Sequence, residues 1–253
     1  MNETSVIDAI DSETPIKGQV FGDVYWDELI LDNGLFQNCQ FHRANFAETS
    51  FEETVFENCT FKNCSFTRGK LDGARFKDCV FFDSDTGTGA DFSFAQLADA
   101  KFDRCNLSTT NFHAASLFGV HFKACTAQGV NFDKASFSNR LTTRSRLVHT
   151  AATIEHSNFD YAIFRGISFE GCKITDTSLR ESDLRECDFK NTDLTGSNIS
   201  GADTAKVCFE KADLRAANIQ GLKLSSLTSF HGMKISADQQ QSLLSELGIS
   251  VFP

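Results

Sequence analysis

Proline is almost absent from this 253-residue chain, which contains only Pro15 and Pro253. Proline has no backbone N–H to donate and is avoided inside sheets, so a long hydrogen-bonded ladder between these two positions is permitted. No run of 18 apolar residues occurs, and the opening segment MNETSVIDAIDSETPIK has no apolar core. These absences argue against a membrane-spanning helix and a secretory signal. We therefore expect a cytoplasmic protein without membrane contact.

Positive charge is also scarce, because 24 Lys and Arg face 34 Asp and Glu, for a formal net charge of −10. This balance disfavours direct nucleic-acid binding and favours a basic partner. The exception is SNRLTTRSRLVHTA at 138–151, which holds Arg140, Arg144 and Arg146 and no acid. This basic island on an acidic chain marks a candidate recognition segment.

The common catalytic and metal-binding motifs are missing. The nine cysteines contain no CxxC, the six histidines no HExxH, and the GxG at Gly87 and Gly89 is followed by no P-loop lysine. Spacings of these kinds are what structural zinc, zinc-protease and phosphate sites require. We therefore expect no enzyme activity, no metal and no cofactor.

What the sequence does contain is a period of five. Large apolar residues stand at every fifth position from Phe21 to Phe81, and the pattern resumes from Phe92 and again from Ile154. On an α-helix, five residues advance a side chain by about 500°, which spreads the positions around the cylinder. On a straight strand, an odd period alternates between the two faces. The backbone must therefore turn once per repeat, as in a solenoid.

A second position of the repeat is small. Two residues before each large apolar residue stands Ala, Cys, Ser or Thr in most repeats, as at Cys39, Ala44, Thr49 and Thr54. A tight corner beside a bulky core residue requires such a volume limit. Eight of the nine cysteines occupy this position, Cys208 being the exception. We interpret them as small core residues.

The period slips twice. Phe81 and Phe92 are eleven residues apart where ten would keep phase, and Phe137 and Phe159 are twenty-two apart where twenty would. We expect surface loops at 83–90 and 139–152; either the solenoid merely tolerates them or they carry recognition. The expected organisation is an acidic N-terminal extension at 1–20 that is a candidate for disorder, a repeat region at 21–230 and a C-terminal module at 231–253.

The C-terminal module predicts a capped helix. Ser236 and Gln239 fit a capping box, and Gly248 is suited to end the helix. A solenoid needs a cover for its last coil, so capping is one role for this module. Dimerisation through an apolar stripe and a short apolar strand is the other. The residues concerned are Leu243, Leu244, Leu247, Ile249, Val251 and Phe252.

The repeat resembles that of the pentapeptide-repeat family, with consensus A(D/N)LXX, most directly in ESDLRECDFKNTDLTGSNISGAD at 181–203. This resemblance implies an all-β fold, a right-handed quadrilateral β-helix with one pentapeptide on each side. The two loops interrupt it, and a helix with a short strand for dimerisation follows it.

Two stretches resemble the Qnr-type quinolone-resistance proteins more specifically: AQGVNFDKASFSNRLTTR at 127–144 and SLLSELGISVF at 242–252. The resemblance implies a C-terminal homodimer that imitates DNA, binds DNA gyrase, with topoisomerase IV as a second candidate target, and protects it from quinolones. It implies partner contacts in the larger loop at Arg140, Thr142, Thr143, Arg144 and Arg146. In the smaller loop it implies contacts at Asp83, Asp85, Thr86 and Gly87.

A period of 20 residues per coil places Asp183 over Asp203 and Asp193 over Asp213. Stacked like charges cost stability, so we expect these four residues to form an acidic face for a basic surface of the enzyme. Solubility of the rod is an alternative explanation for the acids. Alternative functions are an interaction scaffold for another partner, or self-protection against a natural topoisomerase poison.

Overall fold

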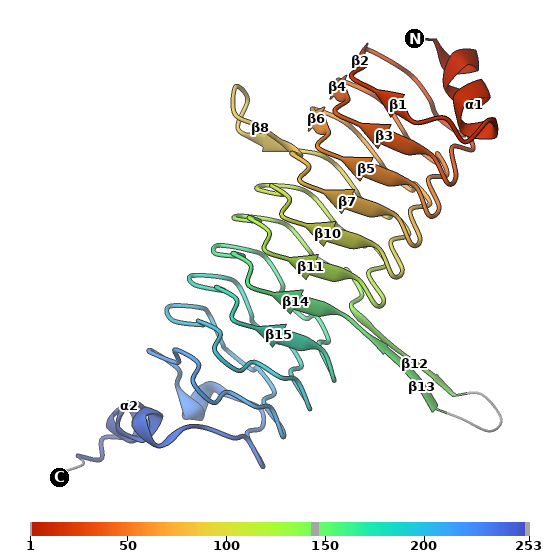
Figure 1. The fold of residues 1–253 in the computed structure, drawn as a ribbon. Coiled ribbons are helices and arrows are strands. Elements are labelled where there is room, and N and C mark those ends of the chain that lie inside the picture. Colours follow the sequence, from red (N-terminus) through yellow and green to blue (C-terminus); the bar gives the residue numbers. More distant parts are fainter. Residues whose placement is uncertain (1, 143–146, 251–253) are drawn as a thin grey trace.

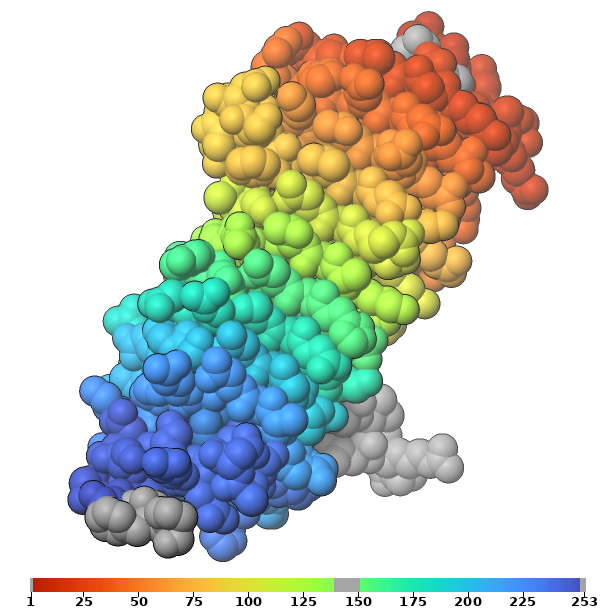
Figure 2. All heavy atoms as spheres, turned by 60° about the vertical axis from the view of Figure 1, so that its left-hand side comes forward, coloured from red at the N-terminus to blue at the C-terminus, as the bar shows by residue number. Residues whose placement is uncertain are grey.

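The computed structural model describes the backbone of residues 2–142 and 147–250, and their side chains except at 139–150. The chain winds into an elongated solenoid in which strands stack in parallel along the long axis (Figures 1 and 2). Residues 20 apart pair between neighbouring coils, as Phe21 does with Phe41 and Phe36 with Phe56. The predicted all-β solenoid is therefore confirmed.

Each coil has four sides, which we number by the inward residues of the first coil: Ile16, Phe21, Trp26 and Leu31. The first side carries an eight-stranded sheet of β1 (Ile16–Lys17), β3 (Leu35–Gln37), β5 (Val55–Glu57), β7 (Arg75–Lys77), β10 (Lys101–Asp103), β11 (His121–Lys123), β14 (Thr153–Glu155) and β15 (Lys173–Thr175). The second side carries β2 (Val20–Gly22), β4 (Gln40–His42) and β6 (Thr60–Lys62). Isolated parallel bridges continue the hydrogen-bonded ladders on all four sides. On the first side they extend as far as Lys234.

The core is a set of aromatic columns. Phe61 stacks on Phe41 and Phe81, with ring centroids 5.0 and 4.8 Å apart, and meets Phe56 and Phe66 on the neighbouring sides edge to face. Both geometries are favourable for aromatic quadrupoles, at about 0.5–1.5 kcal/mol per pair beyond the burial of area. The five-residue period thus places every large residue in contact along the axis and around the coil.

The small position is filled by residues that also donate hydrogen bonds. The Sγ of Cys59 donates to the carbonyl of Phe36, and the Oγ1 of Thr54 to the carbonyl of Leu31, each on the coil above. All nine cysteines are free thiols, and eight are buried. Burial raises the pKa of Cys64 to about 12, so this thiol stays protonated at neutral pH. The interpretation of the cysteines as core residues agrees with these positions.

In most repeats, the residue two positions after the inward one has a left-handed backbone. Asn38, Asn58 and Asn63 hold this place with φ of 55°, 53° and 53°. Asparagine tolerates this region better than most residues because its short side chain bonds locally. This turn redirects the chain onto the next side of the coil.

One outward row on the first side alternates in sign. Glu57 pairs in register with Lys77, Lys77 with Asp103, Asp103 with Lys123, and Lys123 with Glu155. Opposite charges across parallel strands are favourable. Each coil in this segment therefore presents the charge opposite to that of its neighbours.

The two insertions are larger than the phase slips suggested. Phe66 stacks on Phe92, and Phe122 pairs with Ile154, so coils that normally differ by 20 residues differ here by 26 and 32. The insertions thus hold six and twelve residues rather than one and two. Phase reveals an insertion only as its remainder after division by five, which explains the underestimate. The inserted chains form the hairpins β8 (Phe82–Asp83) with β9 (Thr88–Gly89), and β12 (Ser138–Thr142) with β13 (Leu147–Ala151).

The N-terminal extension differs from expectation. Instead of being disordered, it forms helix α1 (Glu3–Asp11), which begins where the Asn2 side chain accepts a hydrogen bond from Ser5 N. Val6 is 1% exposed and packs into the core, and the first coil begins at Ile16 rather than at residue 21. The helix is acidic outside and apolar inside, so composition alone obscured its role as a cover of the first coil.

The C-terminal end carries short helices: the 3₁₀ turns η1 (Leu224–Ser226) and η2 (Ala237–Gln239), then α2 (Gln240–Glu246). Because Asp213 still pairs with Lys234, the solenoid continues slightly beyond residue 230. None of the helices in the described ranges is both long and apolar enough to span a membrane.

A first prediction concerns the aromatic columns. Phe61→Ala should lower the free energy of unfolding by about 3–5 kcal/mol, because it removes stacking on two coils and leaves a cavity. Phe230→Ala, at a half-exposed phenylalanine, is the control and should cost clearly less. Urea titration followed by circular dichroism measures both, and equal losses would contradict the column as the stabilising unit.

A second prediction concerns helix α1. Val6→Ser should speed amide exchange in residues 16–42 by about tenfold or more while leaving residues 174–219 unchanged, because each coil of a solenoid contacts only its neighbours. Glu3→Gln, on the exposed side of the same helix, should leave both regions unchanged. Exchange measured by mass spectrometry tests this, and uniform acceleration along the chain would show that α1 is no local cover.

Candidate partner-binding surfaces

The larger insertion is a hairpin that projects from the rod (Figure 1). It leaves after Phe137 on the fourth side and returns at Ala152 before the first side, and both residues are buried. Ala152 N donates to Phe137 O at 3.2 Å, and Ser138 Oγ donates to Ser168 O at 3.4 Å. The hairpin therefore starts from a fixed base in the core.

The backbone of this hairpin places part of the predicted contact set. Arg140 pairs with His149 and Thr142 with Leu147 across the two antiparallel strands. Thr143, Arg144 and Arg146 lie outside the described residues. The segment predicted as a loop at 139–152 is thus mostly a pair of five-residue strands. The sequence did not predict these strands, because basic residues, Thr and Leu are mixed there without a clear alternation of polar and apolar positions.

The smaller insertion leaves at the corner between the second and third sides, diagonally opposite the larger one. Its tip folds back onto the rod through Asn63: the Nδ2 donates to Asp83 Oδ2 at 2.7 Å, and the Oδ1 accepts from Thr86 and Thr88 at 3.3 and 2.8 Å. Gly89 lies so close to the next coil that a β-carbon there would be 2.4 Å from Thr110 N. The loop is held tightly to the corner.

Among the four residues predicted in this loop, Asp83 has a structural place. It is 4% exposed, and the N–H of Asp85 together with Asn63 and Lys62 holds the pKa of its carboxyl below the ordinary value. Gly87 adopts φ of 71° and its N–H donates to Asp83 O at 2.8 Å. The exposed members of the set are Asp85, Thr86 and Gly87.

The four aspartates predicted as one acidic face lie on two opposite sides. Asp183 pairs with Asp203 on the third side, and Asp193 with Asp213 on the first. The stacking of residues 20 apart is as expected. Asp183 and Asp193, however, are ten residues apart, which is half a coil, so they lie on opposite sides of the rod. The prediction of a single face was therefore wrong.

These aspartates also serve the backbone. Each carboxylate accepts the N–H two residues later, as Asp193 does from Thr195 at 3.0 Å and Asp203 from Ala205 at 3.1 Å. This is the Asx turn, and asparagine does the same at Asn198 and Asn218. The D/N preference of the repeat thus reflects turn geometry, and a negative charge is not required.

Arginines compensate these charges, most closely at Asp183 and Asp213, and Arg185 Nε also lies 3.5 Å from Asp203 Oδ2. Arg185 donates two hydrogen bonds to Asp183 at 2.8 and 2.5 Å, and Arg215 two to Asp213 at 2.8 and 2.7 Å. Each guanidinium holds the pKa of its aspartate below the ordinary value. These positions therefore present less negative charge than the sequence suggests.

Negative charge is concentrated elsewhere, in residues 1–72, which hold 13 acids and five bases. On the fourth side, Asp32, Glu52 and Asp72 follow one another on consecutive coils, and no ion pair involves them within the described residues. Asp32 Oδ1 accepts from Glu52 N at 2.9 Å, which links two of these levels. A count of acidic and basic residues in each segment of the sequence would have identified this surface.

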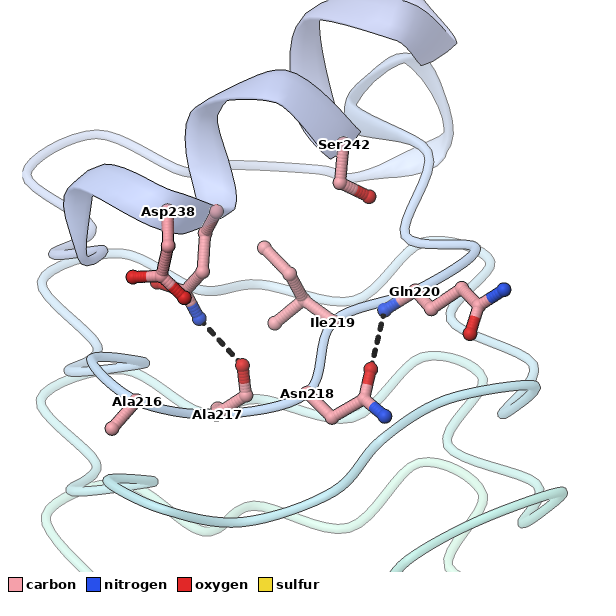
Figure 3. A pocket seen from close by; sticks show the side chains of 8 residues that line it. Ala216, Ala217, Asn218, Ile219, Gln220, Asp238 and Ser242 are labelled. Carbon is pink, nitrogen blue, oxygen red and sulfur yellow. Dashed lines mark hydrogen bonds between the residues drawn. The ribbon is translucent and has the colours of Figure 1, made fainter.

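The C-terminal cap closes the last coil through one glutamine. Gln239 Nε2 donates to Ala217 O at 2.7 Å and to Leu214 O at 2.8 Å. Gln239 and Ala217 both line the hollow drawn in Figure 3. Gln239 Oε1 accepts from Ser236 N, so the predicted capping box is formed. Gly248, with φ of 76°, ends α2 as predicted.

The predicted dimerisation residues divide between cap and surface. Leu243 is buried against the core and Leu244 is partly buried, whereas Leu247 and Ile249 are about half exposed, at 50% and 48%. Val251 and Phe252 lie outside the described residues. Within the described part, no strand follows α2. The C-terminal module therefore caps the rod and leaves two half-exposed apolar side chains, Leu247 and Ile249, near its end.

No group of three or more His, Cys, Asp or Glu side chains within the described residues is arranged to hold a metal ion.

Comparison with known proteins agrees with this architecture. The family model for the pentapeptide repeat region matches residues 29–112, 54–132 and 146–219. The curated quinolone-resistance pentapeptide-repeat protein QnrB96 of Scandinavium goeteborgense is 35% identical over 41% of this chain and 48% of its own length. The pentapeptide-repeat protein QnrB4 of Escherichia coli is 34% identical over 38% of this chain and 44% of its own length. The chain thus spans about half the length of these curated relatives.

Solved structures extend the likeness. A trypsin-treated form of QnrB1, a plasmid-mediated fluoroquinolone resistance protein, matches with a TM-score of 0.74 and 29% identity over 89% of this chain and 99% of that one. HetL, from the cyanobacterium Nostoc, matches in fold alone, with a TM-score of 0.57 and 14% identity over 92% of this chain and 94% of that one. The chain belongs to the pentapeptide-repeat family, and in sequence and structure it is similar to the Qnr-type quinolone-resistance members of that family.

Proposed function

We propose that this protein binds a type II topoisomerase, DNA gyrase first and topoisomerase IV second, and protects it from quinolone-type inhibitors. The observation that carries the proposal is the likeness to QnrB1 over nearly the whole rod, together with a projecting hairpin on a fixed base in this chain. The fold alone would be weak support, since solenoids serve unrelated functions.

In this proposal the rod and the larger hairpin have different tasks. The acidic segment of residues 1–72 attracts a basic, DNA-binding surface of the enzyme by charge. The hairpin carries Arg140, Arg144 and Arg146, whose guanidinium groups suit bidentate contacts with carboxylates. The rod therefore supplies attraction and orientation, and the hairpin supplies the contact that releases the inhibited enzyme.

The charge distribution changes which acids take part. Asp183 and Asp213 are each compensated by an arginine, so they contribute little attraction at a distance. Asp32, Glu52 and Asp72 on the fourth side form no ion pair with any side chain that the structure describes. We therefore assign the approach of the basic surface to the N-terminal third of the rod.

The larger hairpin gives a direct test. Replacing residues 139–150 by Asn-Gly, which suits a two-residue turn between Ser138 and Ala151, should leave the melting temperature unchanged and abolish protection. Protection is measured as the ciprofloxacin concentration that halves gyrase supercoiling, with and without the protein. The triple variant Arg140→Gln, Arg144→Gln, Arg146→Gln keeps the hairpin and tests its charge. If the variant that lacks the hairpin still protects gyrase fully, the proposed role of the hairpin is wrong.

The intact protein tests the function itself. If it leaves the ciprofloxacin response of both gyrase and topoisomerase IV unchanged, protection from quinolones is ruled out. Recovery of a different partner on the immobilised protein would then favour the interaction scaffold.

The smaller loop offers a matched pair of variants. Asn63→Ala removes the hydrogen bonds that hold Asp83, Thr86 and Thr88, each contributing about 1 kcal/mol, and should weaken protection without unfolding the rod. Asn58→Ala is the control, because Asn58 has the same place in the repeat and the same φ of 53° but does not touch the loop. Equal protection by both variants would show that the loop's position is irrelevant.

A further inference from the structure

We propose that the open edge of the first coil, on its third and fourth sides, is a docking site for an extended, basic segment of a partner protein, which adds there as a further strand. This site is defined by Tyr25 and Ile30 with the acids beside them, Asp27 and Glu28. The inference does not depend on the proposed topoisomerase function.

The first observation is unpaired backbone. In the second coil, Asn45 N donates to Val24 O and Ser50 N to Leu29 O, both at 2.8 Å. Tyr25 and Ile30 hold the same positions in the first coil, and no residue in the described ranges accepts from their N–H groups. Each pairs only with the coil below. These N–H groups are therefore free to donate to an added strand.

The second observation is that the first side of the same coil is closed. Pro15 holds there the position that Leu35 holds one coil below, and proline has no N–H to offer. Figure 1 shows α1 at the same end of the rod as β1 and β2, beside β1 and across the coil from β2. The first side is therefore closed to an added strand, whereas Tyr25 and Ile30 on the third and fourth sides keep their backbone donors.

The third observation is apolar exposure at the open edge. Tyr25 and Ile30 are 71% and 73% exposed, the highest values among the large apolar side chains described. Their inward neighbours Trp26 and Leu31 are buried, so the exposure does not come from a loose coil. An edge that combines unpaired donors with apolar side chains is a template for strand addition.

Charge selects the occupant. Asp27 and Glu28 are exposed and form no ion pair within the described residues, and the first 33 residues hold eight acids against Lys17 alone. A second copy of this edge would bring acid against acid, which is unfavourable. A basic segment is attracted instead, and its apolar side chains then cover Tyr25 and Ile30.

The test uses the full chain and a fluorescent decapeptide of alternating lysine and valine with one central glycine. We expect saturable binding by fluorescence anisotropy, weakened by salt, with new exchange protection confined to residues 20–33. The matching peptide with glutamate in place of lysine should not bind. No saturable binding of the lysine peptide at millimolar concentration would overturn the proposal.

Variants separate strand addition from simple charge attraction. Tyr25→Pro with Ile30→Pro copies what Pro15 already does on the first side and should weaken binding about tenfold or more, since two backbone donors are lost. Asp27→Asn with Glu28→Gln should weaken it several-fold, while Glu246→Gln at the far end changes nothing. Undiminished binding by the proline variant, or concentration-dependent self-association mapped to residues 20–33, contradicts the proposal. Melting temperatures confirm that each variant is folded.

Discussion

The contact between one coil and the next is the constraint on which everything else in this protein depends. A ladder of backbone hydrogen bonds joins residues 20 apart, and the same spacing stacks Phe41 on Phe61 and Phe61 on Phe81. Neither interaction exists within a single coil. A coil therefore has no stable structure of its own, and each position of the repeat is chosen for what lies above and below it.

This constraint decides where the chain is free to vary. Inward and small positions are fixed by volume, and where Asp or Asn precedes the inward residue, its side chain accepts a turn N–H, as at Asp193 and Asn198. Insertions at a corner leave the ladder intact, since Phe92 still stacks on Phe66 after six extra residues. The hairpins and the outward charges are therefore the parts of this chain that the coil-to-coil contacts leave free to vary.

The sequence was sufficient for the fold because the period of five excludes both a regular helix and a flat strand. It also identified Ser236, Gln239 and Gly248 as the elements of the C-terminal cap. The sequence did not predict the lengths of the insertions, because the phase of the repeat shows only the remainder after division by five. It also did not predict helix α1, because the acidic composition of the N-terminal segment obscured the apolar side of this helix. Asp183 and Asp213 were misjudged because Arg185 and Arg215 are beside them in space as well as in sequence. The contact residues in both loops stay predictions.

The row of alternating charges on the first side has a consequence for folding fidelity. Coils of nearly equal shape are able to stack on the wrong neighbour, and the aromatic column of the first side discriminates weakly, since phenylalanine holds the same inward place on consecutive coils from Phe36 to Phe122. If a coil were skipped, Glu57 would face Asp103, Lys77 would face Lys123, and Asp103 would face Glu155. Every such error sets like charge against like. The row from Glu57 to Glu155 thus disfavours any stacking in which one coil is skipped.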